Sequence, residues 1–123
     1  TGTALGDPVE ARALHRVHAA RGRPRPLLVC AVKPALGHLE AGAGIVGLLK
    51  LAVQIASCRA PPNLHLRLLN RHLGPGELCS STLAAVECAQ GGARPQGQVS
   101  AFGFSGTNAS AVLGAGAEPV PEE

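Results

Sequence analysis

A histidine and a lysine stand five residues apart at a junction between two predicted elements. Lys33 follows the short apolar run 27–32, and His38 directly precedes the long helical stretch 39–57. A helix N-terminus disfavours positive charge, so we expect the imidazole to be neutral and to donate a hydrogen bond. A lysine that closes an apolar strand lies at the carboxyl edge of a sheet, where sites form in α/β proteins. The pair therefore predicts a site that holds negative charge.

The only two aromatic side chains of the chain lie in one glycine-bearing loop. Phe102 and Phe104 flank Gly103, and Gly106 and Asn108 follow closely. Glycine permits the sharp backbone that such a loop needs, and we expect the Asn108 side chain to tie the loop down by hydrogen bonds. Because the chain has no other aromatic residue, we favour a functional role for this pair over simple core filling.

Two other patterns could do chemistry but are not favoured. The segment 42–47 fits the G-x-G-x-x-G dinucleotide fingerprint, but it lies inside the predicted helix. Its first following acid, Glu77, comes about thirty residues on, where that fingerprint expects about twenty. His15 and His18 stand one helical turn apart, but without a third ligand nearby we interpret them as surface residues. No metal site is predicted.

Apolar spacing and helix-ending residues predict the elements of the first half. Asp7 as N-cap, Pro8 at the first helical position and Glu10 as the capping-box partner predict a helix that ends before Gly22. The run 27–32 predicts a strand buried on both faces, as in a parallel sheet.

The second half is predicted to hold one helix and several strands. Apolar or small residues on every side of 39–57 predict an interior helix. Its glycines would cost about 1 kcal/mol each in an exposed helix, so we expect close packing against another backbone. Strands are expected at 63–69, 98–104 and 109–113, the last two forming a hairpin. The fold class is α/β, with 70–96 the segment hardest to assign.

Composition narrows the function classes. The chain has 123 residues, a net charge of +3, 46% hydrophobic residues and no Trp, Tyr or Met. A core of small side chains suits tightly apposed layers, so we expect a piece truncated at its N-terminus that needs a partner surface. The scattered basic residues lack interleaved aromatics, which argues against nucleic-acid binding. A docking patch for an acidic protein at 12–25 stays open.

Cysteine usage and hydropathy indicate an intracellular, cytoplasmic protein. The four cysteines form no C-x-x-C pair, and we expect free thiols. The longest apolar stretch, 41–56, is interrupted by Lys50 and Gln54 and falls short of a membrane span. We therefore expect a soluble chain without membrane contact.

Four segments in order identify a family. They are 1–11, 32–45, 61–65 and 100–109, beginning Thr-Gly-Thr, Val-Lys-Pro, Pro-Pro-Asn and Ser-Ala-Phe. Together they resemble the β-ketoacyl synthase family, and specifically its modular polyketide synthase branch. The resemblance covers nearly the whole chain up to about Leu113.

The resemblance implies a thiolase-like fold of two similar α/β halves, each a mixed sheet packed between helices. Residues 1–113 would be the C-terminal portion of a ketosynthase domain, and 114–123 a disordered tail. The implied reaction is decarboxylative Claisen condensation. A cysteine of the other half takes an acyl group from an acyl carrier protein, and the enolate of a malonyl-type thioester attacks it.

The resemblance also implies partners and carriers. No cofactor is bound permanently, because the substrates are carried on the phosphopantetheine of the acyl carrier protein. The expected partners are that carrier protein, the missing N-terminal half of the domain and a second copy in a homodimer. The pathway, either polyketide or fatty-acid synthesis, is not distinguished.

Individual residues take roles from the resemblance. His38 matches the second catalytic histidine, whose N–H holds the developing enolate oxygen. Lys33 matches the active-site lysine that organises the charge around that histidine. Phe104 matches the residue whose backbone N–H joins the oxyanion hole and whose ring gates the acyl pocket, in one loop with Phe102 and Gly103.

Some positions extend the match and others depart from it. Thr1 and Thr3 match threonines whose hydroxyls bind the phosphopantetheine arm. Pro34 and Ala35 replace a Ser-Asn pair, which removes a backbone donor and a side-chain amide, and Ser110 replaces a common histidine. We expect these departures to affect the catalytic activity more than the fold.

Alternatives remain beside the catalytic interpretation. The triplet 79–81, Cys-Ser-Ser, is similar to the family's nucleophile motif, but it follows His38, whereas the family's cysteine precedes both histidines. We interpret it as coincidence, so the isolated chain should be inactive. The second hypothesis is a non-catalytic or degenerate partner protein that keeps dimer and carrier-protein contacts. The third is a free-standing protein that binds through the glycine-rich helix.

Overall fold

The computed structural model describes residues 2–19, 27–73, 86–87 and 94–116. The chain divides into two compact units, which are described separately. Unit 1 comprises Thr1–Ala31 and Pro61–Ala85, and unit 2 comprises Val32–Ala60 and Val86–Glu123. The lysine, the histidine and the aromatic loop all belong to unit 2.

Helix α1, Gly6–Ala19, is the main element of unit 1. It confirms the predicted helix, but its N-cap is Thr3 and the prediction of Asp7 was wrong. Thr3 Oγ1 accepts a hydrogen bond from Gly6 N at 2.9 Å, as an N-cap side chain does for the third residue after it. Asp7 Oδ1 accepts instead from Gly2 N at 2.6 Å, which fixes the turn that leads into the helix.

The two strands predicted for unit 1 do not form among the described residues. Only Val29 makes an isolated bridge in the run 27–32. The Asn63 side chain also binds this run, because its Oδ1 accepts from Ala31 N at 2.7 Å and its Nδ2 donates to Val29 O at 2.9 Å. At 63–69 the chain turns instead of extending, since His65 has a left-handed φ of 61°.

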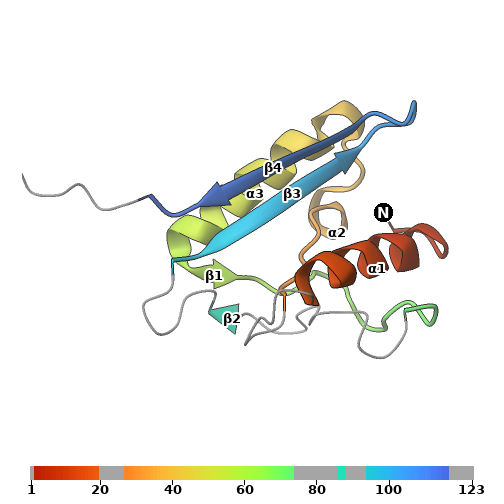
Figure 1. The fold of residues 1–123 in the computed structure, drawn as a ribbon, viewed down its shortest axis with the longest axis horizontal. Helices are drawn as coiled ribbons and strands as arrows, with labels where there is room; N and C mark the ends of the chain where they lie inside the picture. The colour runs from red at the N-terminus through yellow and green to blue at the C-terminus, as the bar shows by residue number, and fades with distance from the viewer. Residues whose placement is uncertain (1, 20–26, 74–85, 88–93, 117–123) are drawn as a thin grey trace, which may run out of the picture. The chain divides into compact units, whose positions relative to one another are not determined.

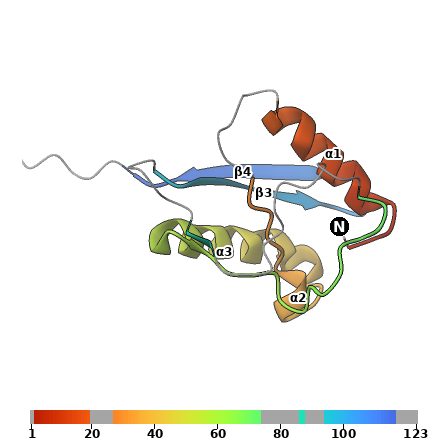
Figure 2. The same cartoon turned by 90° about the horizontal axis from the view of Figure 1, so that it is seen from below.

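Unit 2 contains a helix on one face of a β-hairpin (Figures 1 and 2). Its hairpin strands pair antiparallel from Gln96 opposite Gly114 to Phe102 opposite Asn108, as predicted. A second, short antiparallel pair joins Arg59 to Glu87. The elements are α2 (Lys33–Leu36), η1 (Glu40–Gly42), α3 (Ala43–Ser57), β1 (Arg59–Ala60), β2 (Val86–Glu87), β3 (Gln96–Phe102) and β4 (Asn108–Gly114).

The C-terminal boundary of the fold lies slightly beyond the predicted one. β4 runs through Gly114, and Ala115 N donates to Pro95 O at 3.1 Å. Gly114 and Ala115, which were predicted to begin the tail, therefore belong to the hairpin. Residues 117–123 lie outside the described part of the chain.

Glycines lie in the contact between α3 and β3, as the sequence predicted, but the atoms nearest to them belong to side chains and not to another backbone. A Cβ added to Gly44 would lie 3.1 Å from the Ala101 Cβ, and one on Gly47 would lie 2.8 Å from the Val99 Cγ2. Leu51 contacts Gly97 in the same way. As α3 advances, its contacts move backwards along β3, so the two elements run antiparallel.

Gly47→Ala in the full-length protein tests this contact. The new methyl group forces Val99 to shift, and overpacking of this kind costs about 1–3 kcal/mol, against a gain of about 1 kcal/mol in helix propensity. We expect a lower free energy of unfolding in a denaturant titration. In a Val99→Ala background the clash is gone, and the same substitution should be stabilising. If the Gly47→Ala variant that keeps Val99 is more stable than the parent protein, the contact between Gly47 and Val99 is contradicted.

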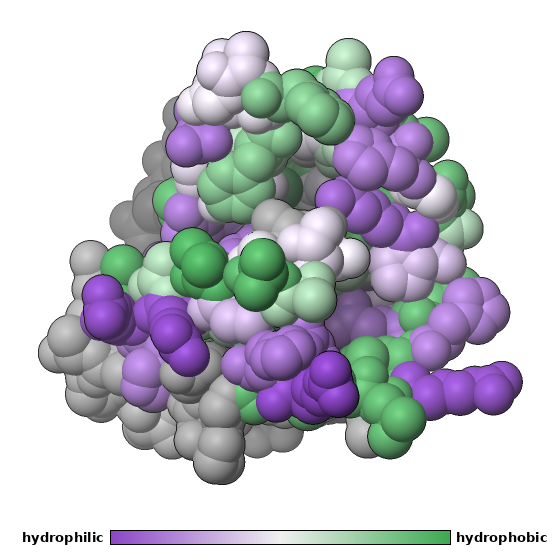
Figure 3. Space-filling view, turned by 90° about the vertical axis from the view of Figure 1, so that its right-hand side faces the viewer, coloured by the Kyte–Doolittle hydropathy of each residue, from purple (hydrophilic) through white to green (hydrophobic). Residues whose placement is uncertain are grey.

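Few hydrophobic side chains are buried by the described residues. Among the described residues only Pro8, Ala11 and Ala60 are buried. Large apolar side chains lie open at the surface beside hydrophilic ones (Figure 3). On α3, Ile45 is 63% exposed, Leu49 60% and Val53 67%. Spaced at four-residue intervals, these three lie on one helix face, which is not the glycine face that contacts β3. The expected interior helix is thus covered on one side only.

The apolar character of this helix bears on membrane association. Glu40–Ser57 is long and apolar enough to cross a membrane by length and composition, so the sequence-based statement that it falls short was wrong. A single such helix is weak evidence, because core helices of water-soluble domains meet the same criterion. The glycine contact with β3 is what a core helix requires.

Candidate active site

His38 lies between α2 and η1, and its ring is held by the backbone. Its Nδ1 accepts a hydrogen bond from Glu40 N at 2.9 Å. An imidazole nitrogen that accepts carries no proton, so the proton of the neutral ring is on Nε2. The Nε2–H of His38, on the other side of the ring from Nδ1, is therefore free to donate a hydrogen bond to a ligand.

Lys33 begins the single helical turn that leads to this histidine. Gly37 N donates to the Lys33 carbonyl at 2.8 Å, which places the two ends of the turn together. Pro34 occupies an N-terminal position of α2, where a missing N–H leaves no bond unmade. Gly37 has φ 75° and ψ −173°, a region open essentially to glycine alone. The chain can thus turn sharply before His38.

The aromatic loop connects β3 to β4 and is closed by backbone hydrogen bonds. Gly103 N donates to Thr107 O at 2.7 Å, and Gly106 N, with φ 85°, donates to Gly103 O at 3.1 Å. Asn108 pairs with Phe102 in the strand register. Among the described residues its side-chain amide makes no hydrogen bond, and the backbone alone closes the turn.

Phe104 stands at the tip of this loop with its whole side chain exposed. Its N–H has no acceptor among the residues that the structure describes, whereas Gly103 and Gly106 use theirs to close the loop. A backbone N–H of this kind is available to an oxyanion. Phe102, the last residue of β3, is also exposed.

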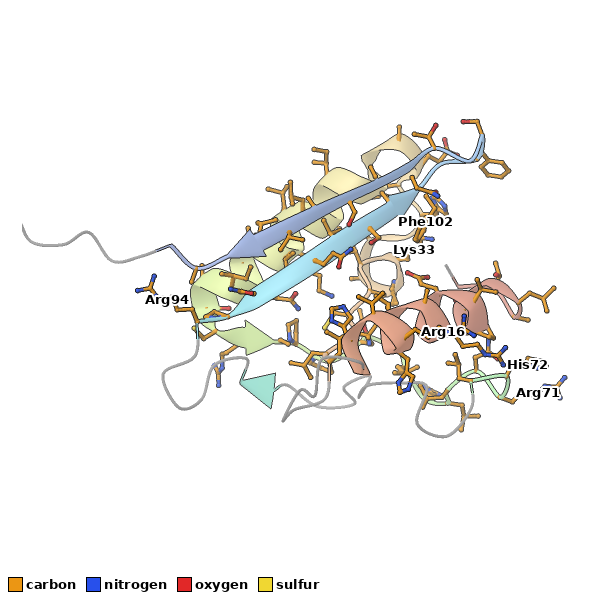
Figure 4. The ribbon with its side chains drawn as sticks, viewed as in Figure 1. Arg16, Lys33, Arg71, His72, Arg94 and Phe102 are labelled. Atoms are coloured by element: carbon orange, nitrogen blue, oxygen red, sulfur yellow. The ribbon has the colours of Figure 1, made fainter. Side chains whose placement is uncertain are left out.

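The packing of unit 2 brings the loop and the histidine to the same end. The first turn of α3 lies against the end of β3, because Gly44 faces Ala101. His38 precedes that turn, and Phe102 follows Ala101. Figure 4 labels Lys33 on α2 and Phe102 at the end of β3. His38 and the aromatic loop thus lie toward the same end of the helix and hairpin.

This arrangement suits the stabilisation of an oxyanion or enolate. All of its side chains are exposed in this chain, including those of Lys33 and His38. Such donors act most strongly where water is excluded. The described residues therefore supply donors, while the walls of a closed site must come from other chain segments.

A family model described as "Beta-ketoacyl synthase, C-terminal domain" matches residues 1–67, more than half of the chain. The chain belongs to the β-ketoacyl synthase family.

Relatives and solved structures agree with this membership. The chain is 44% identical over 124 residues to a phenolphthiocerol/phthiocerol polyketide synthase of Mycobacterium tuberculosis, covering 98% of this chain and 7% of that protein. Ketosynthase twelve of the bacillaene polyketide synthase from Bacillus amyloliquefaciens superposes with a TM-score of 0.79 at 27% identity, covering 93% of this chain and 21% of that one.

A second ketosynthase, from module 6 of the bacillaene synthase of Bacillus subtilis 168, gives a TM-score of 0.77 at 28% identity, with 93% and 22% coverage. The fold is that of a ketosynthase, which confirms the α/β, thiolase-like prediction. The chain spans only a small part of these relatives' length. Both described sheets are antiparallel, so the parallel pairing of the predicted mixed sheet is not seen in this part of the ketosynthase.

Other predicted residues of the ketosynthase segment lie elsewhere. Thr3 belongs to unit 1, where its Oγ1 caps α1. Thr1 and the Cys-Ser-Ser triplet at 79–81 fall outside the described residues. Within the described part, no group of three or more His, Cys, Asp or Glu side chains could hold a metal ion. The dinucleotide-like segment 42–47 lies within η1 and α3, away from any strand-to-helix turn.

Sequence reasoning missed one residue of this site. Glu40 has a left-handed φ of 46°, and its N–H anchors the His38 ring. Glutamate rarely adopts this conformation, so its residue type gave no signal. The turn between the histidine and the following helix is visible only in coordinates.

Proposed function

We propose that the full-length protein is a β-ketoacyl synthase that catalyses decarboxylative Claisen condensation of an acyl thioester with a malonyl-type extender in polyketide or fatty-acid synthesis. The observation that carries this proposal is the His38 ring, whose Nδ1 accepts from Glu40 N and leaves Nε2–H to donate. The N–H of Phe104, which meets no acceptor among the described residues, lies at the same end of unit 2.

The chemistry follows from these donors. The carboxylate–carbon bond of the malonyl thioester breaks, carbon dioxide leaves, and the electron pair forms an enolate. The Nε2–H of His38 donates to the enolate oxygen, where the negative charge develops. The enolate carbon then attacks the acyl carbonyl, whose oxyanion the Phe104 N–H stabilises, and a cysteine thiolate leaves. The ammonium of Lys33 favours negative charge nearby.

Substrate delivery is proposed to use the phosphopantetheine arm of an acyl carrier protein, with no permanently bound cofactor. Thr3 supports this role, because a hydroxyl that accepts from Gly6 N can still donate to another acceptor. Thr1 is proposed to act beside it. Whether the product serves fatty-acid or polyketide synthesis depends on the carrier protein.

The rest of the ketosynthase domain is the proposed partner of α3. The chain covers 21% and 22% of two solved ketosynthases, so most of the domain lies outside it. The exposed stripe of Ile45, Leu49 and Val53 is an apolar surface of the kind that another layer covers. A homodimer of the complete domain is proposed as well.

A cytoplasmic location is proposed from the thiols. Cys30 and Cys58, the cysteines within the described residues, are both free. Free cysteines are typical of reducing compartments.

Incubation of the full-length protein with acyl and ¹³C-malonyl carrier protein tests the proposed reaction. We expect a β-ketoacyl thioester that keeps the labelled methylene and thioester carbons, with one labelled carbon lost as carbon dioxide. Labelled carbon dioxide without a new carbon–carbon bond would instead support a decarboxylating, non-condensing protein. If neither the β-ketoacyl thioester nor labelled carbon dioxide forms, both the condensing and the decarboxylating hypotheses are contradicted.

A further inference from the structure

The half-buried side chain of Asn63 is bonded to the run that leads to Lys33, and no step of the proposed reaction uses it. Its Oδ1 accepts from Ala31 N at 2.7 Å, and its Nδ2 donates to Val29 O at 2.9 Å. One planar amide thus supplies an acceptor and a donor to two backbone groups. The two bonds together fix the direction of the run as well as its distance from Asn63.

The residue between these two backbone groups also contacts the segment that contains Asn63. The Cys30 thiol donates weakly to Pro61 O, with 3.9 Å between Sγ and the oxygen. Val29, Cys30 and Ala31 therefore each make a hydrogen bond with segment 61–63, and all of these residues belong to unit 1. We call this set of three hydrogen bonds the Asn63 clamp.

The Asn63 clamp ends one residue before the helical turn that begins with Lys33. Val32, the N-cap of α2, has φ −97° and ψ −34°, and its carbonyl accepts from Ala35 N at 2.9 Å and from Leu36 N at 3.2 Å. This turn is only four residues long, has no side-chain N-cap and buries none of its residues. So short a helix is not stable by itself. Its direction therefore depends on the backbone that enters it, which the clamp holds.

We propose that Asn63 is a positioning residue, whose amide fixes the backbone before α2 and so determines where the Lys33 ammonium group lies. The attraction between that charge and a developing anion depends on the distance between them. A misplacement of about 1 Å in an active site can cost about a hundredfold in rate. Asn63 itself touches no substrate in this role. The effect on rate rests on the proposed function, whereas the clamp does not.

The test uses the full-length protein and two substitutions of the same shape. Asn63→Val removes both amide bonds, and condensation should slow by about tenfold or more. Acyl transfer to the nucleophilic cysteine should keep the parental rate, because no malonyl-type group takes part in that step. Asn63→Thr should recover most of the lost rate, because one hydroxyl can accept from Ala31 N and donate to Val29 O. Single-turnover mass spectrometry measures both steps.

Asn70→Val is the matched control. The Asn70 amide also bonds two backbone groups of unit 1, since its Nδ2 donates to Ala4 O and its Oδ1 accepts from His72 N. It does not contact the run before Lys33, so this variant should keep the parental ratio of condensation to acyl transfer.

Three results would overturn the positioning role. They are equal losses of condensation and acyl transfer in Asn63→Val, equal condensation rates in Asn63→Val and Asn63→Thr, and an effect of Asn70→Val as large as that of Asn63→Val. Should Asn63→Val fail to fold, Asn63→Ser and Asn63→Ala repeat the comparison of a side chain that has a hydroxyl with one that has none.

Hydrogen exchange of a peptide covering 27–38, measured by mass spectrometry, separates this proposal from the proposed function. Exchange should be faster in Asn63→Val than in Asn63→Thr, because only the hydroxyl still holds the Ala31 amide. Equal exchange in the two variants would overturn the clamp. Faster exchange in Asn63→Val, with a parent protein that makes no condensation product, would support the clamp and reject the proposed function.

Discussion

Replacing His38 with alanine in the full-length protein is expected to slow condensation by about 10²–10³-fold, the usual cost of removing one oxyanion donor. Transfer of the acyl group from the carrier protein to the nucleophilic cysteine should continue, because no enolate forms in that step. Single-turnover mass spectrometry of the acylated protein and of the β-ketoacyl product measures the two steps separately.

Two variants sharpen this experiment. His38→Gln keeps an N–H donor of similar reach and should recover part of the lost rate. His72→Ala removes an exposed imidazole from unit 1 and should behave like the parent. Equal loss of acylation and condensation in His38→Ala would show that the ring supports the structure and does not act on the enolate.

Replacing Leu49 with lysine is the second change with a large expected effect. If the rest of the ketosynthase domain covers the α3 stripe, the substitution removes a buried leucine, worth about 2–3 kcal/mol, and places an unpaired ammonium in the interface. The expected loss exceeds about 4 kcal/mol, which is enough to unfold a marginal domain. Thermal unfolding and soluble yield of the full-length protein measure it.

The same substitution in the 123-residue chain alone is the control. Leu49 is 60% exposed in the 123-residue chain alone, so Leu49→Lys should leave the helix content of that chain unchanged in far-UV circular dichroism. Leu49→Met in the full-length protein conserves volume and should cost less than about 1.5 kcal/mol. Full stability of the full-length lysine variant would show that this face of α3 stays in water.

Elements with local signals could be predicted from the sequence. Helix α1 and helix α3 follow from apolar spacing, and the hairpin follows from two alternating runs around a glycine-bearing turn. The glycines of α3 correctly predicted a close contact, because they are costly in an exposed helix, but β3 meets them with side chains and not with its backbone. Lys33 was singled out as the end of a predicted strand, but in the structure it begins the helical turn α2 that precedes His38.

Features that depend on distant partners could not be predicted. The run 27–32 has strand composition, but a strand needs a neighbour along its length, and among the described residues this run shows an isolated bridge at Val29 and two hydrogen bonds with the Asn63 side chain. The N-cap moved from Asp7 to Thr3 because two residues of capping type compete four positions apart. The positive φ of Glu40 follows from the fixed positions of α3 and His38 and not from its own chemistry.

The glycine contact between α3 and β3 has a consequence for how this segment can change over time. The glycines of α3 lie directly against the Ala101 and Val99 side chains of β3, so a larger residue on either element at these positions has little room. Substitutions that alter the size of an acyl pocket must therefore arise elsewhere.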